Sequence, residues 1–164
     1  GHGDRVPDHD GDEDEDQAIV LSDDQLIDDE MFKLLAEFKE GVRVVLVVES
    51  CYSGSMVWTQ MLRGILPFNS SNPPIPPVWN GLGRRRRVAA DVVLLAATTD
   101  QTTAEGATKA ADLPPFTQKL IEKWEESQGR FDGGYRGLAS AVGCVLNDDL
   151  VTDGGFVESQ PFGI

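Results

Sequence analysis

The stretch that most constrains the fold runs from Val42 to Gly54 and reads VRVVLVVESCYSG. Six of its first seven residues are Val or Leu and do not alternate with polar residues, which is typical of a strand buried on both faces in a parallel sheet. Cys51 lies just past the carboxyl end of this predicted strand. Open α/β sheets place ligands and chemistry at that edge, so the thiol is a candidate nucleophile.

A lone cysteine is more often a packing residue, because cysteine is among the most buried residue types. Two features favour catalysis instead. Small residues surround the thiol, including Ser50, Ser53 and Gly54, and they let a substrate backbone come close. His2 lies 49 residues upstream, and a catalytic cysteine needs a histidine beside it in the fold. The pair His2 and Cys51 is therefore the candidate catalytic dyad.

Short motifs along the chain resemble those of the caspase-like cysteine peptidases. Residues 1–3 (GHG) are similar to the end of their S-G-H-G motif, and residues 49–54 (ESCYSG) are similar to the D-S-C-H-S-G motif of metacaspases and their bacterial relatives. Glu49 stands where that motif has Asp, and Tyr52 where it has His. Further matches follow in the family's order at residues 26–30 (LIDDE), 94–105 (LLAATTDQTTAE), 116–118 (FTQ) and 160–162 (QPF).

The resemblance implies an α/β fold, namely a caspase-like sandwich with a mostly parallel central sheet flanked by helices. In that family several strands precede the histidine motif, so we expect N-terminal strands to be missing from a chain that opens on it. The resemblance also implies three parts within one domain. These are the C-terminal part of the large, catalytic portion (1–66), a linker rich in Pro and Arg (67–87) and the small portion (88–164).

By the same resemblance, Cys51 would attack the peptide bond, His2 would serve as its acid-base partner, and the backbone amides of Gly3 and Cys51 would bind the oxyanion. Glu49 lies two residues before Cys51, so period-two alternation points both side chains to the same side. A carboxylate there selects Arg or Lys in a substrate, and Asp100 is a second candidate pocket residue. The alternative for Glu49 is a capping or solvated carboxylate.

Asp28 and Asp29 match an aspartate pair that contributes to a calcium site in metacaspases. Trp58 stands where a further acidic ligand is expected, and it has no oxygen to offer the ion. The alternative role is structural, with Asp28 as the N-cap of a following helix and Asp29 favourably placed against the helix dipole. We therefore expect that no cofactor is required, with calcium as the alternative.

Charge is concentrated at the start of the chain. The net charge is −14, and residues 1–30 carry −12 of it. Nucleic acid is disfavoured as a partner, because phosphate binding needs a basic face, whereas basic peptides or proteins are favoured. No apolar run approaches the length of about 18 residues that spans a membrane, and two cysteines suit a reducing compartment. We expect a cytoplasmic protein that does not bind membranes.

Hydrophobic patterns predict the remaining elements. The residues at 27–38 that form one apolar stripe predict a helix ending at Gly41. Phe156 to Gln160 indicates a final edge-like strand. The other expected elements are a strand at 18–21, a short helix at 56–66, a buried strand at 92–97, and helices with apolar faces at Phe116, Leu120, Ile121 and Trp124 and at Tyr135, Leu138, Ala139, Val142 and Leu146.

The leading interpretation is a cysteine endopeptidase that cuts after Arg or Lys through a Cys-His dyad. The run from Arg84 to Arg87 is either a self-processing site, a plain basic linker or a charge partner for the acidic segment. Two other functions remain open: a non-catalytic caspase-like module that holds a basic partner on its acidic face, and a caspase that cuts after Asp. The sequence does not indicate an oligomeric state.

Overall fold

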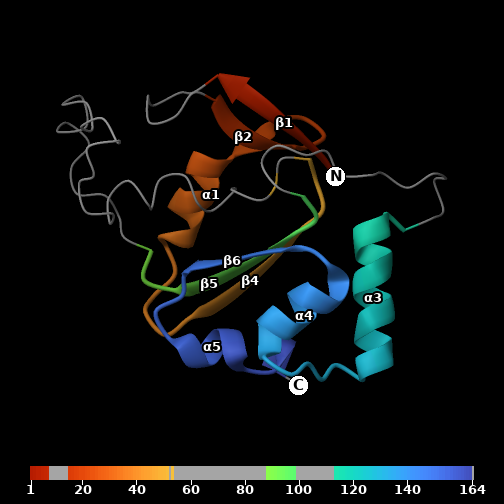
Figure 1. Cartoon of the computed structure of the whole chain (residues 1–164). Helices are drawn as coiled ribbons and strands as arrows, with labels where there is room; N and C mark the ends of the chain where they lie inside the picture. The colour runs from red at the N-terminus through yellow and green to blue at the C-terminus, as the bar shows by residue number, and fades with distance from the viewer. Residues whose placement is uncertain (8–14, 52, 54–87, 99–112, 164) are drawn as a thin grey trace, which may run out of the picture.

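The computed structural model of the 164-residue chain describes residues 1–7, 15–51, 53, 88–98 and 113–163. These residues form a mixed α/β structure with two three-stranded sheets, ordered β1-β2-β3 and β4-β5-β6 (Figure 1). The elements are β1 (His2–Pro7), β2 (Glu15–Val20), β3 (Gln25–Ile27), α1 (Asp28–Leu35), β4 (Arg43–Val48), β5 (Asp91–Ala96), α3 (Pro115–Ser127), α4 (Gly134–Val142), β6 (Val145–Leu150), α5 (Gly154–Glu158) and the 3₁₀ turn η2 (Pro161–Gly163).

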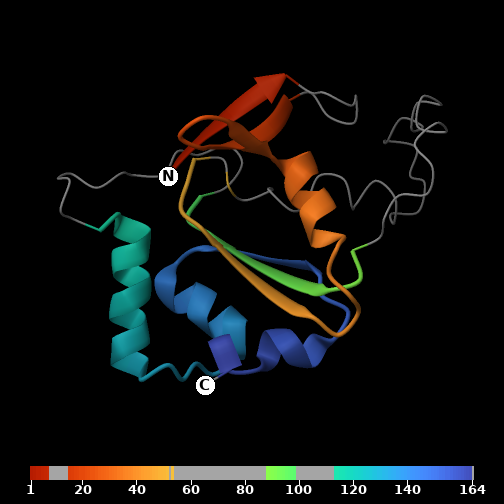
Figure 2. The ribbon, with the colours of Figure 1, turned by 180° about the vertical axis from the view of Figure 1, so that it is seen from behind.

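The second sheet is the centre of the fold. β4 and β5 pair in parallel from Arg43↔Asp91 to Val48↔Ala96, and β6 pairs with β5 in the antiparallel sense. The first sheet is an antiparallel meander. It lies near the end of the second sheet where β4 and β5 finish (Figures 1 and 2). The β1 strand thereby begins close to the carboxyl end of β4 (Figure 1).

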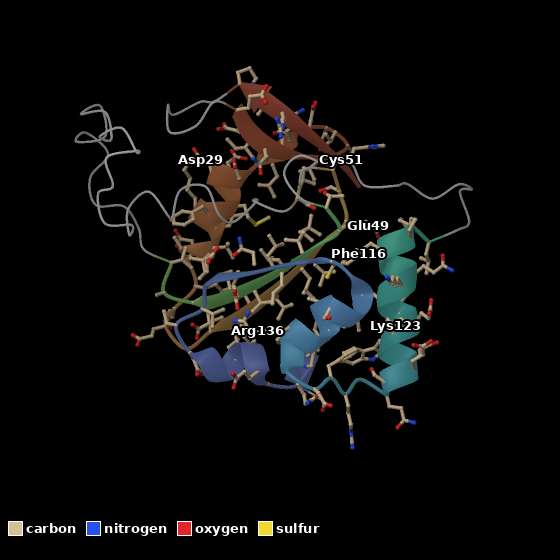
Figure 3. All side chains as sticks on the ribbon, in the orientation of Figure 1. Asp29, Glu49, Cys51, Phe116, Lys123 and Arg136 are labelled. Carbon is tan, nitrogen blue, oxygen red and sulfur yellow. The ribbon has the colours of Figure 1, made fainter. Side chains whose placement is uncertain are left out.

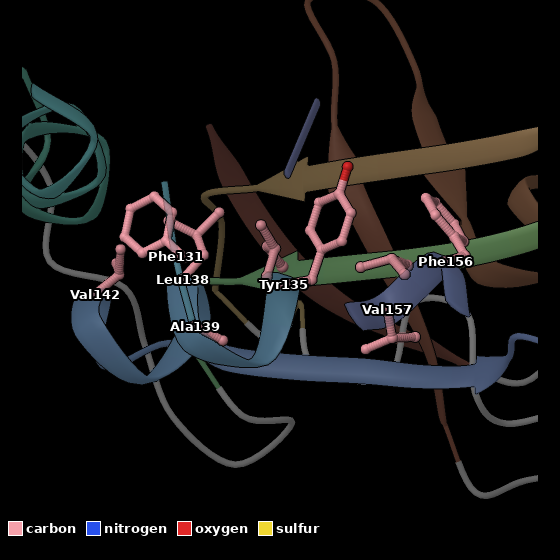
Figure 4. Close-up of a cluster of buried hydrophobic side chains, with 9 residues drawn as sticks. Phe131, Tyr135, Leu138, Ala139, Val142, Phe156 and Val157 are labelled. Carbon is pink, nitrogen blue, oxygen red and sulfur yellow. The ribbon is translucent and has the colours of Figure 1, made fainter. Parts of the chain in front are cut away.

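Two hydrophobic cores cover opposite faces of the second sheet. On one face, Val93 and Leu95 of β5 pack with side chains from α4 and α5 (Figure 4). On the other face, Val92 and Leu94 pack with Leu35 of α1. Alternate residues of β5 therefore serve opposite cores, as the strand pleat requires. The strand at the middle of this sheet is β5, and all six of its residues are buried.

The prediction of a strand at 92–97 is confirmed, but the prediction that Val42–Val48 is buried on both faces is wrong. Among the described residues, β4 pairs only with β5 and lies at the edge of its sheet, and Val47 is 43% exposed. An unbroken aliphatic run does not distinguish an edge strand from a central one. The mostly parallel central sheet is likewise not confirmed, because one pairing is parallel and the other antiparallel.

The helix after β3 is shorter than its apolar stripe predicts. It ends at Leu35 rather than Gly41, and both Leu34 and Phe38 are exposed. Its N-cap is Ile27, not Asp28; the Asp28 carboxylate accepts instead from the backbone amide of Asp29 at 3.1 Å. Without a side-chain cap, the helix depends mainly on the residues that it does bury against the sheet.

Two predictions near the C-terminus are also wrong. Leu146 belongs to β6, because the left-handed backbone at Gly143 ends α4 before it. Residues 156–160 do not form a strand, since most of them lie in α5 and the turn that follows it. The sequence feature that indicates the start of α5 is its N-cap residue, Asp153. The Asp153 carboxylate accepts a hydrogen bond from the amide of Gly155 at 3.0 Å.

At the start of β5, the buried carboxylate of Asp91 joins this strand to the segment that follows β6. Asp91 accepts hydrogen bonds from the amide of Thr152 at 2.6 Å, its hydroxyl at 2.9 Å and the amide of Asp153 at 3.3 Å. Burial alone would raise the pKa of Asp91, but these hydrogen bonds and the charge of Arg43 outweigh it and hold the pKa below its ordinary value of 3.8. The ionised form therefore stabilises the fold.

We predict that Asp91→Asn lowers the free energy of unfolding at pH 7. A lowered pKa contributes stability that is present above 3.8 and is lost as the pH falls through the folded-state value. The difference between wild type and variant should therefore shrink below pH 3.8. Urea unfolding across this pH range measures it, and a difference that stays constant with pH would contradict the assignment.

We also predict that Leu94→Ala destabilises the fold by about 2 to 5 kcal/mol, the usual cost of a large-to-small change in a core. Leu94 has no exposed surface. The matched control is Leu34→Ala on α1, since Leu34 is 55% exposed and its loss should change stability by less than about 0.5 kcal/mol. Equal losses in urea unfolding would contradict the placement of α1.

Candidate active site

The loop that carries Cys51 is held by the end of the neighbouring strand. Beyond the last paired residues of β4 and β5, the amide of Ala97 donates to the carbonyl of Val48 at 3.0 Å. The hydroxyl of Thr98 then donates to the carbonyl of Ser50 at 3.0 Å. Hydrogen bonds between the two segments therefore continue to within one residue of the thiol.

Thr98 also contacts Ser53, which follows Cys51 in the chain. Its hydroxyl oxygen lies 3.3 Å from that of Ser53 and accepts from the Ser53 amide at 3.5 Å. Ser53 is fully buried and Thr98 nearly so. One threonine therefore fixes the backbone on both sides of Cys51. Sequence analysis included Thr98 only in the family match at 94–105 and gave it no role; the available signal was its place directly after the second buried strand.

The GHG motif at the start of β1 lies against the same loop. The backbone nitrogen of Gly1 donates to the carbonyl of Glu49 at 2.8 Å. A Cβ atom added to Gly3 would overlap the carbonyl oxygen of Cys51 and lie 2.8 Å from its carbonyl carbon. His2 stands between these two contacts, and Figure 3 shows Cys51 beside the start of β1. The structure therefore brings together the backbones of the two motifs that sequence analysis paired.

The Glu49 carboxylate is bound to the first turn of α3. One oxygen accepts from the amide of Phe116 at 3.0 Å, and the other accepts from the amide of Thr117 at 3.2 Å and from the Thr117 hydroxyl. Figure 3 shows Glu49 between Cys51 and Phe116. The capping role that we considered as an alternative for Glu49 is thus present in the structure. Sequence reasoning missed Thr117 as its partner, although the Phe-Thr-Gln segment was noted.

Asp28 and Asp29 are both buried, and so is Asp16 of β2. Each of the three carries a further interaction within the fold. In the part of the chain that the structure describes, no group of three or more His, Cys, Asp or Glu side chains is placed to hold a metal ion. Calcium binding at Asp28 and Asp29 stays a prediction, since the acidic segment 8–14 lies outside the described residues.

Cys144 differs from Cys51 in its surroundings. It lies between α4 and β6 and packs against the core. Burial raises the pKa of the Cys144 thiol to about 11, so this thiol is protonated at neutral pH and is a poor nucleophile.

Several predicted features lie outside the described residues, namely Tyr52, Asp100, Trp58, the helix at 56–66 and the linker 67–87 with Arg84 to Arg87. Among the helices that the structure describes, none has the length and apolar character needed to cross a membrane. The division at 1–66, 67–87 and 88–164 and the cytoplasmic location stay predictions.

Comparison with known proteins agrees with the geometry at the start of the chain. The family described as "Metacaspase, peptidase C14 domain" matches residues 1–60, which contain both His2 and Cys51. Metacaspase-7 of Arabidopsis thaliana is 41% identical over 61 residues, which are 35% of this chain and 15% of that protein. Metacaspase-1A of Aspergillus niger is 40% identical over 62 residues, 34% of this chain and 15% of that protein.

A solved structure extends the likeness beyond residue 60. The crystal structure of protein GSU0716 from Geobacter sulfurreducens superposes with a TM-score of 0.63 at 25% sequence identity. The superposition covers 98% of this chain and 67% of that one. The fold is therefore similar to that of a solved structure over much more of the chain than residues 1–60.

The mixed α/β fold, with a cysteine just past the end of the parallel β4–β5 pair and a His-Gly motif against it, is consistent with a caspase-like fold. Over residues 1–60, the chain is similar to the metacaspase peptidase domain. The matched region spans about 15% of the length of the metacaspases named above.

We predict that Gly3→Ala destabilises the protein by about 1 to 3 kcal/mol, as overpacking usually does, because the added methyl group meets the Cys51 backbone. It should also change the rate at which iodoacetamide alkylates Cys51. Gly1→Ala is the matched control, since a Cβ there has nothing within 4 Å. If the two variants unfold and react alike, the contact between β1 and the cysteine loop is wrong.

Proposed function

We propose that this protein is a cysteine endopeptidase that hydrolyses peptide bonds after Arg or Lys, with Cys51 as nucleophile and His2 as its partner. The observation that carries the proposal is the packing of Gly3 against the Cys51 backbone. This packing brings the His-Gly motif and the thiol loop into one place. The metacaspase match over residues 1–60 supports it, because both motifs lie in that segment.

In the proposed reaction, the Cys51 thiolate attacks the carbonyl carbon of the substrate. Backbone amides of Gly3 and Cys51 stabilise the oxyanion that forms. His2 then gives its proton to the departing amine, and water hydrolyses the resulting thioester to release the acid and the thiol. No step is assigned to a metal ion.

Preference for a basic side chain is proposed from Glu49. Glu49 lies two residues before Cys51 in the loop that follows β4, and a carboxylate attracts the cation of Lys or Arg. The acidic first thirty residues favour basic peptides and proteins as substrates and disfavour nucleic acid.

We further propose that the chain cuts itself near Arg84 to Arg87, where four consecutive arginines satisfy the same preference for a basic residue.

We predict that the protein releases fluorophore from peptides ending in Arg or Lys and that Cys51→Ala lowers kcat by about 10⁴-fold or more, as loss of a nucleophile does. Cys144→Ala is the matched control. Its activity should match wild type, because the Cys144 thiol is protonated at neutral pH. The measurement is initial rate against substrate concentration for the three proteins.

The same assay separates the alternative functions. Cleavage after Asp in place of Arg would indicate an Asp-directed caspase. Equal, negligible signal from wild type and Cys51→Ala on every peptide would indicate a non-catalytic module that binds basic partners. Incubation of the purified protein followed by mass spectrometry tests self-processing, which should vanish in Cys51→Ala.

A further inference from the structure

The start of α3 lacks a cap of its own. Its N-cap residue, Pro114, makes no side-chain hydrogen bond to the helix. The first helical residue, Pro115, has no backbone N–H to satisfy. Phe116 and Thr117 carry the next free amides, and helix ends need an acceptor for such groups. Both amides donate to Glu49. The cap of α3 is thus supplied by a residue 67 positions away in sequence.

The same carboxylate lies two residues before the candidate nucleophile. An ionised carboxylate accepts at about four lone-pair sites, and three hydrogen bonds come from α3. Roughly one site remains for a donor of a substrate. The contacts from α3 therefore fix the rotation of the carboxylate and the direction in which its remaining site faces.

Of the described residues at this helix end, Thr117 is the one whose side chain also bonds the Glu49 carboxylate. A backbone amide is present whatever the residue, but the hydroxyl is a property of the side chain, and it bonds the same Glu49 oxygen as the Thr117 amide. Hydrogen bonds to charged groups are stronger than those between neutral groups. Loss of the hydroxyl would leave each Glu49 oxygen with a single backbone donor, and the carboxylate would be held less firmly in its orientation.

We propose that Thr117 is a positioning residue for substrate recognition. Its hydroxyl, with the first amides of α3, holds the Glu49 carboxylate beside Cys51 in the orientation that receives the basic side chain preceding the cleaved bond. This inference rests on the proposed function, because it names the element that sets the basic-residue preference.

The test compares Thr117→Val with Thr117→Ser in the full chain, using an Arg-terminated fluorogenic peptide. The Val variant keeps the shape of the side chain and loses the hydroxyl, so KM should rise about tenfold or more, the factor that corresponds to a hydrogen bond with a charged partner. Values of kcat should change little, and the Ser variant should restore KM. An unchanged KM in Thr117→Val would overturn the inference.

Thr152→Val is the matched control for a purely structural effect. It removes a hydroxyl donated to another carboxylate, that of Asp91, at the far end of β5. Thr152→Val should lower the unfolding midpoint and leave KM unchanged. A similar rise in KM in both valine variants would assign the effect to general destabilisation and overturn the positioning role.

A binding measurement keeps the inference distinct from the peptidase proposal. In the Cys51→Ala background, the Kd of the Arg-terminated peptide is measured by fluorescence anisotropy with Thr, Val and Ser at position 117. A Kd that rises about tenfold with Val and recovers with Ser supports the inference even if the wild type shows no turnover, in which case only the proposed function fails. Equal Kd values for Thr and Val overturn it.

Discussion

The parallel pairing of β4 with β5 is the constraint on which the rest of the structure depends. Parallel strands bring their carboxyl ends to one edge, and here the pairing is extended past both strands by the bonds from Ala97 to Val48 and from Thr98 to Ser50. The thiol loop therefore has a fixed backbone before any partner approaches it. Gly3 can then pack on it, because glycine alone leaves room for the Cys51 carbonyl.

A second set of contacts ties this loop to the C-terminal part of the chain. Glu49 belongs to the segment that carries Cys51, the candidate nucleophile. The helix α3 begins much later in the chain, at Pro115. The prolines at the start of α3 remove the local means of satisfying the helix end, so the helix requires an external acceptor. A single carboxylate then fulfils this structural need, and in the proposed function it also receives the basic side chain of the substrate. The two roles are compatible because a carboxylate has several acceptor sites.

Much of this site could be predicted from sequence, because its signals are local. The aliphatic run before Cys51, the small residues around it and the His-Gly pair are each visible in a short window.

The features that could not be predicted from sequence depend on which strands and side chains pair in the fold. The edge position of β4 follows from which strand lies beside it, and the buried role of Thr98 follows from its alignment with Ser50 across the sheet. The Thr117 contact joins residues that only the fold brings together. Residues 156–160 were mistaken for a strand because their apolar side chains outweighed the short-range capping signal of Asp153.

The order of the strands has one more consequence. β4 and β5 are adjacent in space, but residues 49–90 separate them in the chain, and each hydrophobic core draws side chains from both sides of that interval. A single nick within residues 54–87 would therefore leave six paired residues on each of two strands and both cores in place. The two fragments would remain together as a non-covalent complex whose integrity depends on dilution, as that of a heterodimer does.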